Sequence, residues 1–304
     1  MNILYKSLAE RGRQWAEIIA RRYPHARFWQ WPEVPDPAAV EYLVAWDASA
    51  ELIAGLPNLK ALFSVGAGAD QFDYAALPVV RMVEPGIVSG MVEYVTFAVL
   101  GLHRDMPLYL QQQSERRWQG HSLVPASQRR VGVMGLGELG RAVLMQLQTL
   151  GFACRGWSRT PKSLPGAVCF AGDEQRAAFL ADTDILVCLL PLTPATHGIL
   201  NAQLFGQLPT GAALVQVGRG AQLNHDDLLT ALDNGRLRGA VVDVVDPEPL
   251  PPTHPFWSHP ALWLTPHIAS QTQADSAVSA LMDNIARFER GEPMVGVIDR
   301  QRGY

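Results

Sequence analysis

The feature that most constrains the fold of this chain is a glycine-rich turn near its middle. The apolar run Arg130–Met134 leads directly into GLGELG at residues 135–140, and apolar residues three or four apart then continue to Leu150. This order of strand, tight turn and helix places free N–H groups and the positive end of a helix dipole where a pyrophosphate would bind. The segment therefore predicts a dinucleotide site formed by Gly135, Leu136, Gly137, Glu138 and Leu139. A tight βα turn without a ligand is the alternative.

Each glycine of this turn has its own expected role. Gly135 permits the sharp turn, Gly137 lets the backbone approach the phosphates, and Gly140 lets the helix pack closely on the strand. A second strand, predicted at Phe152–Trp157, follows in register with the first strand and the helix. This context makes the motif much more specific than an isolated set of glycines.

Strand-like runs alternate with helical patterns along the whole chain, which is typical of parallel sheets covered by helices on both faces. The 304 residues are enough for roughly two domains. We expect an α/β protein with two doubly wound, Rossmann- or flavodoxin-like domains and an active-site cleft between them. Residues 1–98 and 272–304 are predicted to form a substrate-binding domain, and residues 99–271 an inserted dinucleotide-binding domain. Hinges are expected near residues 94–102 and 269–274.

The expected elements follow from apolar periodicity. Strands are predicted at Met1–Tyr5, Glu41–Trp46, Ala61–Val65, Arg130–Met134, Phe152–Trp157, Asp184–Leu190, Ala212–Val217, Ala240–Val245 and Leu262–Thr265. Helices are predicted at Leu8–Arg22, Glu93–His103, Leu139–Leu150, Asp226–Asn234 and Thr272–Arg290. The polar segment Gln111–Arg130 is predicted to be a loop.

Charge and cysteine content exclude several classes of protein. The net charge of −4 gives no chain-wide attraction to nucleic acid or to an anionic membrane, and no uninterrupted apolar segment reaches the roughly 18 residues of a spanning helix. The N-terminus lacks the order of regions found in a signal peptide. Cys154, Cys169 and Cys188 are too few and too irregularly spaced for a disulfide framework or a zinc site, so we expect them to be buried apolar residues. A cytoplasmic protein without a metal is the simplest expectation.

The end of the second strand predicts which dinucleotide is preferred. NAD-specific sites normally place an Asp or Glu here to bind the ribose 2′-hydroxyl, whereas this chain has Ser158-Arg159-Thr160. Arg159 can bind a 2′-phosphate as a permanently charged fork, with a hydrogen bond from Ser158 and added charge from Lys162. We therefore predict that NADP(H) is preferred and that NAD(H) is a weaker cofactor. The alternative is that Arg159 is an ordinary surface cation.

Three groups suited to the reduction of a 2-keto acid stand at predicted strand ends. Arg219 lies between two glycines after one strand, Glu248 lies between two prolines after the next, and His267 follows the third. An arginine fork can bind carboxylate and carbonyl oxygens. A carboxylate beside an imidazole favours the imidazolium, which can then donate a proton near neutral pH. Separate structural roles for the three residues are the alternative.

These motifs, in this order and at these spacings, resemble the D-isomer-specific 2-hydroxyacid dehydrogenase family over essentially the whole chain, and most closely its glyoxylate/hydroxypyruvate reductase A branch. The resemblance extends to residues 66–70 (GAGAD), to Glu93-Tyr94 and to the Trp-Ser-Arg of the second strand. It implies that Arg219 binds and polarises the substrate, that His267 donates the proton and that Glu248 pairs with His267. It also implies a homodimer formed through the cofactor domain.

The resemblance also assigns the remaining site residues. Asp243 would touch the nicotinamide carboxamide, and the cofactor would be lined further by Leu190, Pro191, Val217 and Gly218. The substrate carboxylate would be received by the backbone of Val65, Gly66 and Ala67, where glycine-rich turns form anion nests. Trp46 would be a pocket wall, with a core tryptophan as the equal alternative. The chain departs from the family pattern at Gln216 and Gly218, where Asn and Ala are common.

The expected function is NADPH-preferring reduction of small 2-keto acids, such as glyoxylate and hydroxypyruvate, to 2-hydroxy acids. One alternative is an NAD-dependent dehydrogenase of another 2-hydroxy acid, such as phosphoglycerate, which the cation at Arg159 disfavours. The other is a dinucleotide-sensing binding protein or corepressor on the same fold, which the presence of all three catalytic residue types disfavours.

Overall fold

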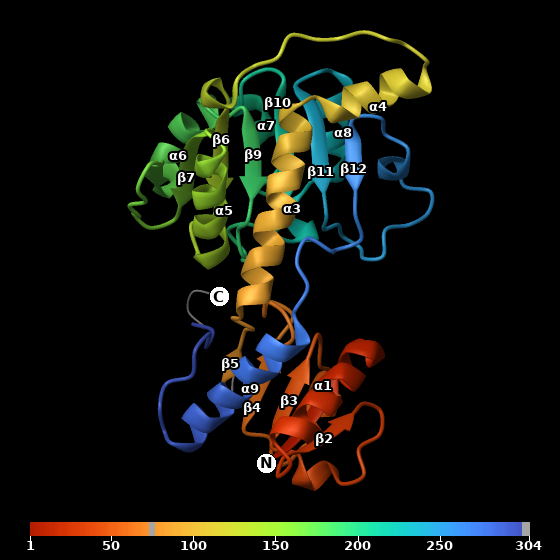
Figure 1. Cartoon of the computed structure of the whole chain (residues 1–304), viewed down its shortest axis with the longest axis vertical. Helices are drawn as coiled ribbons and strands as arrows, with labels where there is room; N and C mark the ends of the chain where they lie inside the picture. The colour runs from red at the N-terminus through yellow and green to blue at the C-terminus, as the bar shows by residue number, and fades with distance from the viewer. Residues whose placement is uncertain (73–76, 300–304) are drawn as a thin grey trace. The chain divides into compact units, whose positions relative to one another are not determined.

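The computed structural model describes residues 1–72 and 77–299, and the chain divides into two compact units. Unit 1 comprises residues 1–87 and 271–304, and unit 2 comprises residues 88–270. Each unit contains one parallel sheet with helices, so the predicted fold class is confirmed (Figure 1). The predicted boundary at residues 98–99 falls in the second half of the helix α3 (Pro85–His103), whereas the units divide at residues 87–88, in the first turn of this helix. The difference arises because α3 is continuous and buries Val95, Val99 and Leu102 in the core of unit 2.

Unit 1 is a five-stranded parallel sheet in the order β2-β1-β3-β4-β5. Its central strands are the most apolar, and Leu4, Leu43 and Leu62 share one core cluster. Helix α1 packs against α9, which returns from the far end of the sequence to complete the unit (Figure 1). The elements are β1 (Asn2–Lys6), α1 (Ala9–Arg22), β2 (Arg27–Gln30), β3 (Tyr42–Ala45), α2 (Ala50–Ala54), β4 (Ala61–Ser64), β5 (Val79–Val80) and α9 (Ala274–Glu289), with a 3₁₀ turn at Pro37–Ala39.

Unit 2 is a seven-stranded parallel sheet in the order β12-β11-β10-β9-β6-β7-β8. The order reverses between β6 and β9, which makes a topological switch point where ligands bind in open α/β sheets. Its strands are β6 (Arg130–Met134), β7 (Ala153–Ser158), β8 (Val168–Ala171), β9 (Ile185–Cys188), β10 (Ala212–Gln216), β11 (Leu237–Val242) and β12 (Leu262–Leu264). Its helices after α3 are α4 (Met106–Ser114), α5 (Glu138–Thr149), α6 (Gly172–Ala181), α7 (Ala202–Gln207) and α8 (His225–Asp233), with 3₁₀ turns at Ala126–Gln128, Gly220–Gln222 and Pro255–Trp257.

The central strands of unit 2 are continuous apolar runs because both faces of the sheet are buried. In β10, Ala212 and Leu214 belong to one core cluster, whereas Ala213 and Val215 belong to the other. Helices α3 and α5 cover the second face, and α6, α7 and α8 cover the first (Figure 1). This double cover leaves the carboxyl ends of the strands, and the loops that follow them, as the place for polar groups.

Several predicted elements differ from the structure for local reasons. Helix α4 includes the first residues of the predicted loop 111–130, since no strong helix breaker follows Pro107 until after Ser114. Helix α3 begins eight residues earlier than its predicted start at Glu93, because Pro85 is well placed in a first helical turn. Strand β11 ends at Val242 rather than Val245, because Asp243 and the residues after it leave the sheet and enter the site described below.

Within the part of the chain that the structure describes, α3 is long and apolar enough to cross a membrane by length and composition alone. The core helix of a soluble domain passes the same test. Val95, Ala98, Val99 and Leu102 are fully buried against the sheet of unit 2. We therefore read α3 as a core helix.

Candidate active site

The glycine turn between β6 and α5 has the geometry that a pyrophosphate requires. Gly135 has a φ of +104°, and a Cβ there would lie 2.6 Å from the carbonyl oxygen of Leu189. A Cβ on Gly140 would overlap the carbonyl oxygen of Gly135, so the first turn of α5 packs against the loop only without a side chain. At Gly137, by contrast, no described atom lies within 4 Å of an added Cβ. The N-terminus of α5 is therefore open at the position where phosphate oxygens would approach.

The end of β7 presents cations and no acid. Arg159 and Lys162 are exposed, and the indole of Trp157 anchors the strand end by donating to the carbonyl of Gly172 at 2.8 Å. Ser158 is nearly buried, and its hydroxyl donates to the carbonyl of Thr160 at 2.8 Å. The Ser158 hydroxyl therefore stabilises the turn that carries Arg159, and this contact was not predicted from the sequence.

The catalytic groups predicted from sequence come together at the carboxyl ends of β10, β11 and β12. The Nδ1 atom of His267 lies 2.9 Å from Oε2 of Glu248, and Oε1 of Glu248 accepts the N–H of Val245 at 3.1 Å. A carboxylate can only accept, so Nδ1 carries the hydrogen and Nε2 is the other ring atom available for exchange with a substrate. Arg219 follows β10, and its Nη1 donates to the carbonyl of Gly218 at 2.8 Å.

The charges of these groups act on one another. Burial alone would raise the pKa of Glu248, but the hydrogen bond from His267, the charge of that ring, the Val245 N–H and the charge of Arg219 hold it below its usual value. The carboxylate of Glu248 is therefore ionised at neutral pH. Arg219 and His267 thus both lie within electrostatic reach of Glu248, in a single unit.

Asp243 fixes the loop that carries His267. Its carboxylate accepts the N–H groups of Ile268 and Ala269, each at 2.8 Å, and its carbonyl accepts the N–H of His267 at 2.8 Å. His267 has a φ of +54°, a conformation that residues other than glycine rarely adopt. The hydrogen bonds to Asp243 stabilise this conformation and so determine where the imidazole lies.

A chain of hydroxyl groups extends from Asp243 to helix α3. The hydroxyl of Thr265 donates to Oδ1 of Asp243 at 2.6 Å, so the phenol of Tyr94, 2.5 Å from Thr265 Oγ1, must donate to Thr265. Burial raises the pKa of Tyr94 to about 12; the hydrogen bond to Thr265 opposes this rise, and the charge of Asp243 adds to it. The phenol therefore stays protonated and remains a donor. From the sequence, Tyr94 was expected only as part of a family motif and at the start of a hinge, and no role was predicted for Thr265.

The substrate residues predicted in the first part of the chain lie together in unit 1, with Trp46 directly after β3 and residues 65–67 directly after β4. A Cβ on Gly66 would lie 3.3 Å from the ring of Trp46, which is 41% exposed and so is not a core tryptophan. The N–H of Val65 donates to Ala45 in the sheet at 3.0 Å, and the N–H of Gly66 donates to Oγ of Ser64 at 3.1 Å. Two of the three predicted anion donors in residues 65–67 thus already have partners within the chain.

Among the further residues predicted to line the cofactor, Leu190 lies beside the glycine turn, since a Cβ on Gly135 would lie 3.1 Å from its backbone nitrogen. Val217 and Leu190 are 5% and 7% exposed, and the carbonyl of Pro191 accepts the hydroxyl of Thr196 at 2.7 Å. No group of three or more His, Cys, Asp or Glu side chains that could hold a metal occurs in the described part of the chain. Cys154 and Cys188 are buried, as predicted, and Cys169 is half-buried.

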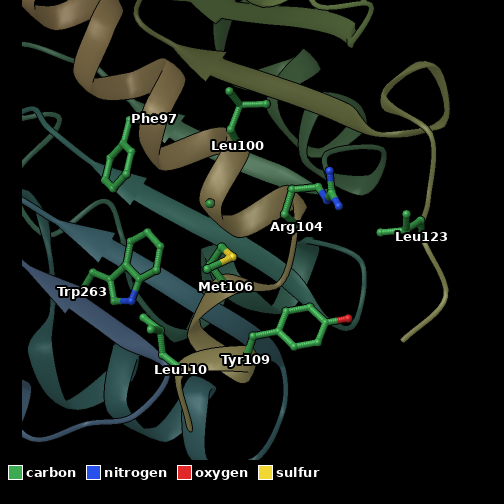
Figure 2. Close-up of a pocket in the computed structure, with 9 residues that line it drawn as sticks. Phe97, Leu100, Arg104, Met106, Tyr109, Leu110, Leu123 and Trp263 are labelled. Carbon is green, nitrogen blue, oxygen red and sulfur yellow. The ribbon is translucent and has the colours of Figure 1, made fainter. Parts of the chain in front are cut away.

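An apolar groove of about 820 Å³ lies in unit 2 and contains none of the predicted catalytic residues. Figure 2 shows side chains from α3 and α4 facing Trp263, and the rings of Phe97 and Trp263 are stacked with their centroids 5.7 Å apart. Several of its side chains are unusually exposed for apolar residues, including Phe97 (61%), Leu110 (46%) and Leu123 (67%). The groove is lined by Phe97, Leu100, Gly101, Arg104, Met106, Tyr109, Leu110, Leu123 and Trp263.

Comparison with known proteins gives full-length matches. Residues 96–269 match the sequence profile described as D-isomer specific 2-hydroxyacid dehydrogenase, NAD binding domain. The glyoxylate/hydroxypyruvate reductase A of Yersinia enterocolitica is 38% identical over 314 residues, with 100% of each chain covered.

Two solved structures are similar to the whole chain. A D-isomer specific 2-hydroxyacid dehydrogenase from Xanthobacter autotrophicus Py2 in complex with NADPH is 36% identical, with a TM-score of 0.95 over 100% of this chain and 99% of the other. The NADPH-dependent glyoxylate/hydroxypyruvate reductase of Sinorhizobium meliloti, in complex with NADP and sulfate, is 32% identical, with a TM-score of 0.93 over 100% of this chain and 99% of that one.

Proposed function

This chain belongs to the D-isomer specific 2-hydroxyacid dehydrogenase family, and we propose that it reduces glyoxylate and hydroxypyruvate to their 2-hydroxy acids with NADPH preferred over NADH. The relatives from Yersinia enterocolitica and Sinorhizobium meliloti are glyoxylate/hydroxypyruvate reductases, and the Xanthobacter and Sinorhizobium structures contain NADPH and NADP. The site residues of unit 2 support the same assignment independently, as follows.

The residues present fit a dinucleotide with a 2′-phosphate. Gly135 makes the turn, Gly137 leaves the N-terminus of α5 open to the pyrophosphate, and Leu136, Glu138 and Leu139 provide the surrounding backbone. Arg159 and Lys162 offer positive charge at the end of β7, where an acid would repel the 2′-phosphate. Leu190, Pro191, Val217, Gly218 and Asp243 would line the rest of the cofactor.

When bound, the nicotinamide would supply the hydride for the keto carbon. Arg219 binds the keto acid through its guanidinium fork and withdraws electron density from the carbonyl. His267 donates the proton from Nε2 to the carbonyl oxygen as the hydroxyl forms, because its Nδ1–H is held by Glu248. The negative charge of Glu248 stabilises the imidazolium before the transfer and orients the ring throughout.

The substrate carboxylate is assigned to the loop after β4 in unit 1. Ala67 and the glycine-rich backbone around it offer N–H groups, with Val65 and Gly66 contributing where the carboxylate replaces their present partners. Trp46 packs beside Gly66 and would limit the length of the substrate.

The observation that carries the proposal is the 2.9 Å hydrogen bond between His267 and Glu248. The charge of Arg219 also stabilises the ionised form of the same Glu248 carboxylate. The test is a steady-state comparison of NADPH and NADH with glyoxylate, hydroxypyruvate and phosphohydroxypyruvate. Turnover of the first two keto acids with NADPH at the higher kcat/KM supports the proposal. Preference for NADH with the phosphorylated acid would favour the alternative dehydrogenase, and absence of turnover with every pair would favour a dinucleotide-sensing protein.

We also propose that the protein is a cytoplasmic homodimer whose interface includes the apolar groove of unit 2. Phe97, Leu110 and Leu123 expose about half or more of their surface there, and contiguous exposed apolar surface commonly marks a protein–protein contact. A second copy of the same surface can cover it through a two-fold axis.

A further inference from the structure

Two buried glutamines hold the main chain of Arg219 from either side. Gln216, the last residue of β10, donates through Nε2 to the carbonyl of Arg219 at 2.8 Å. Gln222, at the end of the following 3₁₀ turn, accepts the N–H of Arg219 through Oε1 at 2.9 Å. Both side chains are 0% exposed. Both polar backbone groups of Arg219 are therefore bound by side-chain amides.

Gln222 is also tied to a second loop. Its Nε2 donates to the carbonyls of Leu190 and Pro191 at 3.0 and 3.1 Å, so both of its N–H bonds and its oxygen are used. The loop after β9 is itself braced, since the Thr196 hydroxyl also donates to Pro191. Burying an amide is unfavourable unless its hydrogen bonds are made, but a fully bonded one rigidifies its surroundings. Gln222 thus fastens Arg219 to a fixed neighbouring loop.

Gly218 provides the space that this arrangement needs. A Cβ on Gly218 would overlap Oε1 of Gln222 and would lie 3.1 Å from the carbonyl oxygen of Leu190. The guanidinium depends on the same peptide, because Nη1 of Arg219 donates to the carbonyl of Gly218 at 2.8 Å. The departures of Gln216 and Gly218 from the family pattern therefore belong to one structural unit with Gln222.

We propose that Gln222 is a positioning residue that, together with Gly218, sets the backbone of Arg219 so that its guanidinium meets the keto acid. The inference rests on the role of Arg219 in the proposed function. Displacement of a reacting group by about 1 Å can lower the rate roughly 100-fold. A shift in the backbone of Arg219 would displace its guanidinium from the keto acid and should lower the rate in this way. Gln222 itself does not need to touch the substrate.

The test is a double-mutant cycle between Gln222→Leu and Arg219→Ala, with glyoxylate and NADPH as substrates. Alone, Gln222→Leu should lower kcat/KM by about 10- to 100-fold, with kcat and KM both affected, while the Kd for NADPH changes by less than about threefold. In the Arg219→Ala background, Gln222→Leu should change kcat/KM by less than about twofold, because Gln222 acts only by positioning the guanidinium that this background lacks. The matched control is Thr183→Val, which removes a buried hydrogen bond to Phe179 at the other end of β9 and should lower the melting temperature without changing kcat/KM.

A second cycle does not depend on the folding of Gln222→Leu. Gly218→Ala should reduce kcat/KM in the wild-type chain by displacing the amide, but it should have an effect of less than about threefold in the Gln222→Ala background, where the overlapping atom is gone. Additive effects in either cycle would overturn the inference and leave the proposed function intact. Full turnover by Arg219→Ala alone would instead remove Arg219 from its proposed role, and absence of turnover in the wild-type chain would overturn the proposed function.

Discussion

His267 is held at two points by the loop that follows β11, since the carbonyl of Asp243 accepts its backbone N–H and the carboxylate of Glu248 accepts its Nδ1–H, both within 3 Å. The backbone bond sets the position of the residue, and the side-chain bond sets the tautomer and the orientation of the ring. Removal of either partner should therefore affect turnover in a different way.

Replacement of His267 by alanine should lower kcat for glyoxylate by roughly 10²- to 10⁴-fold, because general acid catalysis is lost. Glu248→Gln keeps the shape but removes the charge that stabilises the imidazolium, so its loss should be smaller, about 10- to 100-fold. Steady-state assays with saturating NADPH measure both. His259 provides the control, because it also lies near a carboxylate, at 3.3 Å from Asp233, and His259→Ala should turn over normally. Wild-type kcat in His267→Ala would remove this residue from its role.

The lowered pKa of Glu248 predicts how stability changes with pH. A carboxyl whose pKa is lower in the folded state stabilises the fold above its unfolded value, about 4.5, and this contribution is lost as the pH falls through the folded value. The difference in melting temperature between wild type and Glu248→Gln should therefore be largest near pH 6 to 7 and should shrink towards about pH 3. Calorimetry across this range measures it. For Glu174→Gln, an exposed glutamate on α6, the difference should remain small; a Glu248→Gln difference independent of pH would contradict the assignment.

Arg159→Asp should move cofactor preference towards NADH. The substitution replaces a charge that attracts the 2′-phosphate by one that repels it and can instead bind the 2′-hydroxyl of NADH. We expect the ratio of kcat/KM for NADPH to that for NADH to fall by about 100-fold or more, since a charge-assisted pair is both lost and reversed. Arg176→Asp makes the same charge change on α6 and should leave the ratio unaltered. An unchanged ratio in Arg159→Asp would show that Arg159 is an ordinary surface cation.

The parts of the molecule that sequence predicts well are those with a local physical signature. The turn at Gly135 is specified by its own φ and by close packing at Gly140, and the central strands are apolar because both faces are covered. The edge strands β2 and β8 were not predicted, because they are short and incompletely buried and so lack a continuous apolar run. Their existence depends on pairing with β1 and β7 rather than on their own composition.

In the candidate site, too, some residues could be predicted from the sequence and others could not. Arg219, Glu248 and His267 were found because each follows an apolar strand, and parallel strands bring their carboxyl ends to one edge. The supporting contacts were not found: Thr265 bonds Asp243 across 22 positions, and Gln222 bonds Leu190 across 32. A glutamine that will be fully buried looks in sequence like any polar residue after a strand. Only the folded arrangement reveals its partners.

Asp243→Asn should separate positioning of His267 from proton transfer. Asparagine can accept only one of the two N–H groups of Ile268 and Ala269, and its own amide would face the other donor. We expect a loss of about 1–3 kcal/mol in the free energy of unfolding and a clear fall in kcat, with the alkaline limb of the pH–rate profile, where the proton donor is lost, retained. Urea unfolding and pH–rate measurements test this. A variant with normal kcat would mean that the loop keeps His267 in place without the carboxylate.

The apolar groove of unit 2 gives the last prediction, which concerns assembly. If a second copy covers Leu110 and Leu123, then a lysine at either position would bury an unpaired charge in the interface and should convert the dimer to a monomer at micromolar concentration. Sedimentation equilibrium measures the mass directly. Met145→Lys is the matched control, because Met145 is 65% exposed on α5 and does not line the groove. The wild-type chain should sediment as two copies and Met145→Lys should do the same, whereas Leu110→Lys and Leu123→Lys should sediment as one. Lysine variants that stay dimeric would show that the interface lies elsewhere. A monomeric wild-type chain would show that there is no such interface.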